Sequence, residues 1–358
     1  MSASGIGTSV SIAESTVLGA AEALQGALWC AGAHGAPDLG RSHLAAALAD
    51  GWGLAGAELE YVPQGGGSHH WRCRAGGGER FVSVDDLTAT FHAATDEDAA
   101  FAALARAYAT AGALRDRAGL EFVVAQIPDR DGGPLRRLGR RYAVRVEPVI
   151  AGEPGVFGEY APADRRAVAG LVGRLHAGSD RVPAGLPQVA DLRIPSRASL
   201  QAALAEVDRP WASGPWAEPA RALLAARAVE VAERLAEHDA VAARVRETQA
   251  RWVVTHGEPH GGNVIRDAGG GLHLIDWDTA MVAPPERDLQ MVLADDLTGW
   301  DEYRAAAAPV ELDPEALGLY RRLWALADIA SFVTTLRRPH RQTTDTRHAY
   351  EALAHYLG

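Results

Sequence analysis

Two short apolar runs, Trp252–Thr255 and Leu272–Ile275, flank a polar loop and a run of three glycines at 269–271. Both runs have the length of a strand, and polar or glycine-rich stretches of this kind mark the turns between strands. The segment therefore predicts a strand, a loop, a strand, a turn and a strand. Three side chains that can hold a proton or a metal ion fall at the ends of these loops: Glu258, Asn263 and Asp276.

The chemistry of these three side chains is that of phosphoryl transfer. That reaction needs a carboxylate to orient or deprotonate an acceptor hydroxyl, and an amide and a second carboxylate to hold Mg²⁺ against the phosphates. We therefore expect Glu258 to be the catalytic carboxylate and Asn263 and Asp276 to be metal ligands. Asp278 follows closely enough to support this site or to act as an alternative ligand.

A second interpretation of the loop is a transition-metal site. His256, Glu258 and His260 alternate, so on an extended strand their side chains would share a face, like ligands of Zn²⁺ or Fe²⁺. Pro259 and the glycines at 261–262 interrupt regular strand geometry, which argues against this interpretation.

The segment resembles the catalytic and metal-binding loops of the aminoglycoside phosphotransferase family, which includes choline kinases and antibiotic kinases and has a protein-kinase-like fold. The family pattern H-G-D-x-H-x-x-N, followed by I-D-W/F-[DE], is matched in type and spacing at His256, Gly257, His260, Asn263, Ile275, Asp276, Trp277 and Asp278. Residues 283–289 are similar to the family's P-x-E-R-D-L segment. The chain departs from the pattern in two ways: Glu258 replaces the catalytic aspartate, and no lysine is present, so all 35 basic residues are arginine.

The resemblance implies an O-phosphotransferase that uses ATP or GTP with Mg²⁺ and phosphorylates a hydroxyl of a polar, cationic small molecule, as an aminocyclitol-antibiotic kinase does. It also implies that His256 braces the catalytic loop and that Arg287 and Asp288 tie the metal loop to a helical lobe. The two departures favour a pseudokinase, which binds a nucleotide or a metabolite without transfer. The sequence leaves both functions open.

Residues 59–62, 70–74 and 80–84 predict an antiparallel meander, because glycine-rich turns separate them. The resemblance places the first of these turns over the nucleotide phosphates, where glycines let backbone N–H groups approach closely. Pro148 and Gly152 interrupt regular structure and predict a hinge at 147–152, which would present backbone groups to adenine. The expected cofactor-binding residues are Gly65, Gly66, Gly67, Ser68, Ser83, Glu147 and Val149.

Ser83 occupies the place on the third strand where the family usually carries a phosphate-binding lysine. A hydroxyl cannot supply that positive charge, and loss of a comparable electrostatic contact costs roughly 3–4 kcal/mol. Four arginines on neighbouring strands are candidates to replace it, and the sequence does not choose among Arg72, Arg74, Arg80 and Arg145. The usual acidic partner is equally open, so Glu97 stays unassigned.

The order of three strands, one helix at 96–114 and two strands at 121–127 and 141–146 is that of the small lobe of a kinase-like fold. With the helices that follow, the resemblance implies an α+β, bilobal, protein-kinase-like fold. The antiparallel-sheet lobe is expected over 41–150 and a mainly helical lobe over 151–358, after an extension over 1–40 that is either a packed helix or a loose tail. Helical periodicity further predicts helices at 15–30, 44–50, 164–177, 217–247, 314–336 and 343–356.

The net charge of −11 argues against binding to nucleic acid, which requires basic residues that neutralise phosphates. An acidic surface attracts cationic small molecules, or it serves solubility alone. The chain has only two cysteines, Cys30 and Cys73, which is typical of a reducing compartment. No cationic residue precedes Arg41, as a secretory signal would require, and no apolar stretch is long enough for a bilayer. We therefore expect a cytoplasmic protein without membrane partners. Four later acids line a substrate site or form a solvated face: Asp295, Asp296, Asp301 and Glu302.

Overall fold

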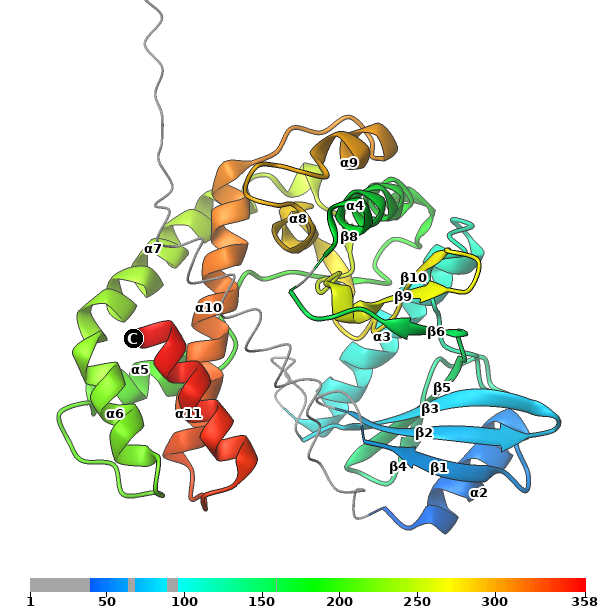
Figure 1. Cartoon of the computed structure of the whole chain (residues 1–358), viewed down its shortest axis with the longest axis horizontal. Helices are drawn as coiled ribbons and strands as arrows, with labels where there is room; N and C mark the ends of the chain where they lie inside the picture. Colours follow the sequence, from blue (N-terminus) through cyan, green and yellow to red (C-terminus); the bar gives the residue numbers. More distant parts are fainter. Residues whose placement is uncertain (1–38, 64–67, 89–95, 159) are drawn as a thin grey trace, which may run out of the picture.

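The computed structural model describes residues 39–63, 68–88, 96–158 and 160–358. Five strands form an antiparallel sheet in the order β1-β2-β3-β5-β4 (Figure 1). The first three are the predicted meander, and two glycines with positive φ, Gly76 and Gly77, form the turn between the second and third. The strands are β1 Glu58–Val62, β2 Ser68–Ala75, β3 Gly78–Asp86, β4 Arg136–Leu138 and β5 Tyr142–Pro148.

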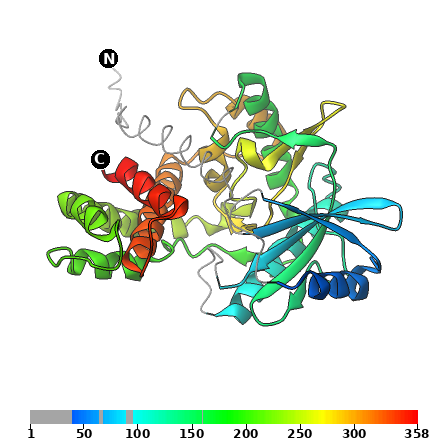
Figure 2. The same cartoon turned by 60° about the horizontal axis from the view of Figure 1, so that its bottom comes forward.

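The two faces of this sheet differ in chemistry. Val82 and Val84 of β3 pack with Leu44 and Leu48 of α2 (Arg41–Trp52) in an apolar layer, and Figure 2 shows α2 along the outside of the sheet. Successive residues of a strand point to opposite faces. The alternate positions therefore form the other face, which we call the polar face, and it carries Ser68, His70, Ser83, Asp85, Arg145 and Glu147.

Helix α3 (Glu97–Asp116) connects the sheet to the rest of the molecule. Asp96 caps it by accepting hydrogen bonds from the backbone N–H groups of Asp98 and Ala99. Its apolar side joins the largest core cluster of the described residues, where Leu104 lies with Val172 of α4 (Pro162–Ala177) and with Trp277. One core therefore joins α3 to α4 and to the segment that carries the predicted metal ligands.

The second half of the chain is mainly helical. Its C-terminal helices share a separate apolar cluster, and they lie together on one side of the molecule in Figure 1. The predicted fold class, an antiparallel sheet followed by a mainly helical region, is confirmed. The remaining helices are α5 Arg197–Ala205, α6 Ala217–Ala226, α7 Ala228–Arg246, α8 Glu286–Val292, α9 Trp300–Ala306, α10 Pro314–Arg337 and α11 Thr344–Leu357.

Two small sheets hold the segment that the sequence singled out. One has the order β10-β9-β6 and the other the order β7-β11-β8. The predicted strand, loop, strand, turn, strand pattern is present as β8, β9 and β10. The strands are β6 Gly152–Pro154, β7 Gln188–Val189, β8 Val253–Thr255, β9 Val264–Asp267, β10 Leu272–Leu274 and β11 Met281–Ala283.

Three sequence predictions need correction or fall outside the description. Residues 121–127 are not a strand: Val124 donates to Leu274 O (3.0 Å) and Ile127 to Val146 O (2.7 Å), so the segment crosses from one sheet to another and pairs fully with neither. The strand beside β5 is β4 instead. The helical region at 217–247 is two helices that meet at Arg227. The predicted helix at 15–30 lies outside the described residues.

Within the described ranges, no helix combines the length and the apolar character needed to cross a bilayer.

Candidate active site

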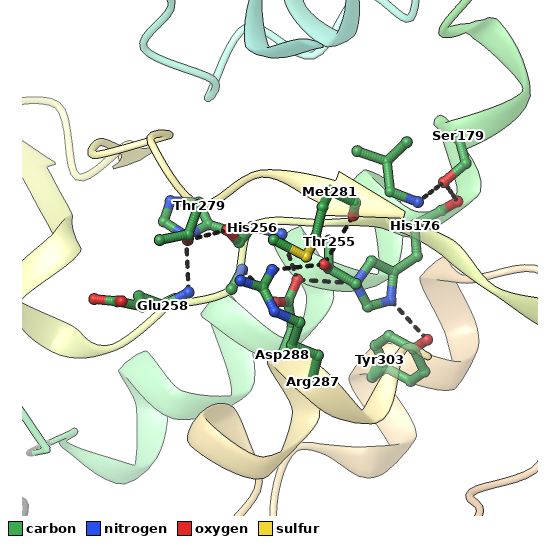
Figure 3. Close-up of polar contacts among 12 residues, drawn as sticks. His176, Ser179, Thr255, His256, Glu258, Thr279, Met281, Arg287, Asp288 and Tyr303 are labelled. Atoms are coloured by element: carbon green, nitrogen blue, oxygen red, sulfur yellow. Dashed lines mark hydrogen bonds and ion pairs between the residues drawn. The ribbon is translucent and has the colours of Figure 1, made fainter. Parts of the chain in front are cut away.

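The loop expected to be catalytic (residues 255–263, called the catalytic loop below) is held by one buried carboxylate, that of Asp288 on α8 (Figure 3). Asp288 Oδ2 accepts a hydrogen bond from the backbone N–H of His256 (2.8 Å), and Oδ1 accepts one from Gly257 (2.6 Å). His176 of α4 lies 3.0 Å from Oδ2 through Nε2 and contacts the Tyr303 hydroxyl through Nδ1 (2.9 Å). Burial alone would raise the pKa of Asp288, but the hydrogen bond with His176 and the charge of Arg287 lower it. The carboxylate is therefore ionised at neutral pH.

His256 stabilises the loop from within. Its Nε2 lies 2.8 Å from Ile275 O, and its Nδ1 accepts the backbone N–H of Glu258 (3.2 Å). Burial lowers the pKa of His256, which favours the neutral ring that these two contacts require. Both ring nitrogens are therefore engaged, and neither is left to bind a metal. Along the described ranges, no group of three His, Cys, Asp or Glu is placed to ligate one, which disfavours the transition-metal interpretation.

Gly257 has a backbone conformation that only glycine adopts easily. Its φ is +105°, and a Cβ at this position would lie 2.3 Å from the guanidinium of Arg287. Arg287 in turn donates to Thr255 Oγ1 (2.9 Å), and Thr279 Oγ1 donates to His256 O (2.8 Å). The loop is thus fixed on both sides before any ligand binds.

Glu258 projects away from these bracing contacts, and its carboxylate lies apart from Asp288 and Arg287 in Figure 3. The side chain is partly exposed, and its Oε2 lies 3.8 Å from His260 Nε2, too far for a hydrogen bond. The backbone of the residue is held while the carboxylate is available to another partner. This is the arrangement that a group acting on a substrate hydroxyl needs.

Asn263 and Asp276 are neighbours across a loop contact. The backbone N–H of Ile275 donates to Asn263 O (3.0 Å), which places Asp276 beside the end of the catalytic loop. The amide Nδ2 of Asn263 contacts Glu258 O (3.0 Å) and His260 Nε2 (3.3 Å). Both amide hydrogens are used by the loop, and Oδ1, the atom that can ligate a cation, makes no hydrogen bond to a described residue.

Two carboxylates of like charge meet at the second loop. Asp276 adopts φ +65°, an unusual conformation for a residue with a side chain, as often occurs at functional sites. Burial and the charge of Asp278 raise the pKa of Asp276 well above its usual range. A divalent cation would relieve this repulsion. The donor set of one amide oxygen and two carboxylates suits Mg²⁺, which prefers oxygen ligands.

The predicted nucleotide residues fall into different places. Gly65, Gly66 and Gly67 lie outside the described residues. Val149 lies just beyond the end of β5, where the backbone leaves the sheet, and its side chain is exposed. Ser68, Ser83 and Glu147 belong to a network on the polar face: Ser68 Oγ donates to Asp85 Oδ1 (2.6 Å), and Ser83 Oγ donates to Glu147 Oε2 (3.0 Å).

One arginine is part of this network. Arg145 Nε donates to Glu147 Oε1 (3.1 Å), and its Nη1 donates to Asp85 Oδ1. Burial alone would raise the pKa of Glu147, but Arg145 and the Gln126 amide (3.0 Å) lower it. Burial and Arg145 lower the pKa of His70, whose Nδ1 lies 3.0 Å from Ser83 Oγ, to about 4, so this imidazole is neutral.

The other candidate arginines are exposed. Arg72 and Arg74 pair with Glu79 at 3.9 and 3.3 Å, and Arg80 donates to Glu79 O (2.8 Å). Glu97, left unassigned by the sequence, lies 3.8 Å from Arg140 at the exposed start of α3.

Sequence reasoning missed three members of the polar network: His70, Asp85 and Gln126. The alternation of Ser83 and Asp85 with Val82 and Val84 was a signal for Asp85, because residues two apart on a strand share a face. No comparable local signal marks Gln126, which reaches Glu147 from the irregular segment 120–127.

The later acids form a solvated surface. Asp295 lies 3.4 Å from Arg321, Asp301 lies 3.4 Å from Arg304, and Glu302 lies 3.5 Å from Arg166; the two aspartates are exposed and Glu302 is partly exposed. Asp296 is also exposed, and it caps its own turn by accepting from Thr298 N. A cavity of about 600 Å³ opens between α4 and β9, and no acid of the catalytic or metal loop lines it.

Comparisons with known proteins identify the family and support the fold. A family model described as "Phosphotransferase enzyme family" matches residues 58–320. The chain is 30% identical to Protein StrN of Streptomyces griseus over 311 residues, which cover 84% of this chain and 86% of that protein. Its fold is similar to that of a spectinomycin phosphotransferase solved with ADP and spectinomycin (TM-score 0.67, 14% identity, 88% and 94% of the two chains). It is also similar to that of an aminoglycoside phosphotransferase from Alicyclobacillus acidocaldarius (TM-score 0.53, 14% identity, 90% and 92%).

Proposed function

The chain belongs to the phosphotransferase enzyme family, and from this premise we propose that it transfers the γ-phosphoryl group of ATP to a hydroxyl of a polar, cationic small molecule of the aminocyclitol or aminoglycoside class. The observation that supports the proposal is the backbone contact between Ile275 N and Asn263 O (3.0 Å), which makes the two expected metal-binding segments neighbours in space. The spectinomycin phosphotransferase of similar fold was solved with ADP and spectinomycin, which supports both the nucleotide and the class of acceptor.

Each residue of the site has a role in this proposal. Glu258 orients the acceptor hydroxyl and takes its proton, since its carboxylate is free of the bracing contacts. Asn263 Oδ1 and Asp276 would hold Mg²⁺, with Asp278 beside them. When bound, Mg²⁺ supplies the positive charge that offsets the charge of the phosphates. His256 and Asp288 keep the loop in place, and such positioning is the main protein contribution to this reaction.

The surface beside Glu258 suits a cationic acceptor. A small hollow there is formed by the linker after β6, by α8, by α10 and by the catalytic loop, and its lining residues are Phe157, Gly158, His260, Gln290, Met291 and Trp324. An aromatic face attracts an ammonium group, and nearby carboxylates strengthen that attraction. We therefore place the amine-bearing acceptor over this hollow, with one hydroxyl at Glu258.

The test is calorimetry for MgATP, followed by phosphate transfer to a panel of aminocyclitols and nucleoside antibiotics. Glu258→Gln should lower turnover at least about 100-fold while MgATP affinity stays the same, because the amide cannot accept the proton. Glu247→Gln is the matched control, an exposed glutamate after α7 that should leave both unchanged. Equal turnover in Glu258→Gln and the wild type would remove Glu258 from the mechanism.

A second function, binding of a nucleotide or metabolite without transfer, is favoured by two features. Glu258 stands where the family has aspartate, and Ser83 stands where it has lysine. Tight MgATP binding without transfer to any member of the panel would favour this second function.

A further inference from the structure

We propose that the guanidinium group of Arg145 replaces the missing lysine and contacts the phosphates of the bound nucleotide. This inference rests on the proposed function, because it assigns the cation of the same nucleotide site. It begins from a deficit: Ser83 has no charge, and phosphate binding in kinase-like sites depends on a fixed positive group.

The sheet register places Arg145 next to the position of the missing lysine. Ser83 of β3 is directly opposite His70 of β2 on one side and Arg145 of β5 on the other. The three side chains form one cross-strand row on the polar face. The positive charge has therefore moved by one strand, a distance of about 4.8 Å.

Arg145 is held in a fixed orientation. Nε donates to Glu147 and Nη1 donates to Asp85, and the guanidinium lies 4.8 Å from the centre of the Tyr108 ring. Nη2 makes no hydrogen bond to the residues that the structure describes. A guanidinium group with two nitrogens fixed by carboxylates can offer the third to a phosphate oxygen at little entropic cost.

The acidic partners also come from the sheet. In protein kinases the lysine of β3 pairs with a glutamate on the small-lobe helix. Here Asp85 of β3 and Glu147 of β5 take that place, and Glu97 of α3 contacts Arg140 instead. Arg145 therefore has its acidic partners within the sheet and needs none from α3.

Arg145 is also close to the expected metal ligands. Segment 120–127 contacts both regions: Gln126 donates to Glu147, the partner of Arg145 (3.0 Å), and Val124 donates to Leu274 O (3.0 Å), two residues before Asp276. A polyphosphate held by a cation at Asp276 would therefore lie within the field of Arg145. The three other candidate arginines are exposed, and each of them contacts Glu79.

The test compares ligands with and without phosphates in Arg145→Met. Calorimetry measures affinity for MgADP and for adenosine. The expected result is a loss of about 10- to 100-fold for MgADP and less than about twofold for adenosine, because only the phosphates touch Arg145. Arg80→Met, on the opposite face of the same sheet, is the control and should change neither affinity.

A second variant separates phosphate binding from folding. Ser83→Lys combined with Arg145→Met restores a cation at the family position and supplies Asp85 and Glu147 with a partner, so it should recover most of the MgADP affinity. If Arg145→Met does not fold, this double variant and Arg145→Gln carry the same comparison. Equal losses for MgADP and adenosine, or no loss for either, would overturn the inference. If the wild type binds no MgATP, the proposed function fails, and this inference fails with it.

Discussion

Asp288 offers the sharpest test of how the catalytic loop is held. Its carboxylate is fully buried and accepts the N–H groups of His256 (2.8 Å) and Gly257 (2.6 Å) as well as the contact with His176 (3.0 Å). Asp288→Asn keeps the shape, but it turns an NH₂ group toward one of these donors. The variant therefore loses one charge-assisted hydrogen bond, about 1.5–3 kcal/mol, and leaves a buried N–H unpaired, about 1–3 kcal/mol.

We expect the free energy of unfolding to fall by about 3–5 kcal/mol, the range for breaking a buried charged pair. The assay is urea unfolding followed by the fluorescence of the nine tryptophans; one of them, Trp277, has its ring centroid 4.5 Å from that of His256. Asp301→Asn is the control: its side chain is 87% exposed, so the change should stay within about 0.5 kcal/mol. An unchanged urea midpoint for Asp288→Asn would refute the role of Asp288 as the brace.

The same variant predicts a pH dependence. The folded-state pKa of Asp288 lies below its value in the unfolded chain, so its stabilisation is fully present above an unfolded pKa of about 3.9. It is lost as the pH falls through the folded-state pKa. The stability difference between wild type and Asp288→Asn should therefore be constant near neutrality and shrink below about pH 4. A difference that does not depend on pH would contradict this linkage.

Two further changes test the loop and the metal site. Gly257→Ala should lower the free energy of unfolding by about 2–3 kcal/mol and slow transfer, because φ is +105° and the new Cβ meets Arg287. The control Gly56→Ala, at φ +68° in open space, should lower it by only about 1–2 kcal/mol. Chemical unfolding measures both variants, and equal losses would count against the clash with Arg287. In the presence of a chelator, Asp276→Asn should raise the melting temperature, because it removes the repulsion between Asp276 and Asp278. In Mg²⁺, the same variant should weaken nucleotide binding at least about tenfold. A lower melting temperature in chelator would contradict the repulsion.

The catalytic segment could be predicted because its chemistry is local in the sequence. Glu258 and Asn263 are five residues apart, and Asp276 follows one hairpin later, so residue type and spacing were sufficient to group them. Long helices were also predictable: α3 and α10 are rich in alanine and leucine, which favour helices, and an aspartate caps the N-terminus of each.

Contacts between distant segments could not be predicted from spacing. Asp288 was expected to tie two parts of the protein together, but its two bonds to the backbone at 256 and 257 depend on the three-dimensional path of the chain. Arg145 could not be chosen over Arg72, Arg74 and Arg80, because that choice depends on which face of the sheet is buried and on the pairing of β3 with β5. Residues 121–127 were apolar enough for a strand, but their partners are divided between two sheets.

The fixed partners of Arg145 bear on how this protein is switched on and off. In kinases that pair a lysine with a helix, swinging the helix outward separates the charges and silences the enzyme. Asp85, Arg145 and Glu147 belong to adjacent strands of one sheet, so a displacement of α3 would leave their ion pairs intact. We therefore expect the protein to be constitutively active. Its rate would depend on the concentrations of acceptor and nucleotide, and not on a regulatory movement of α3.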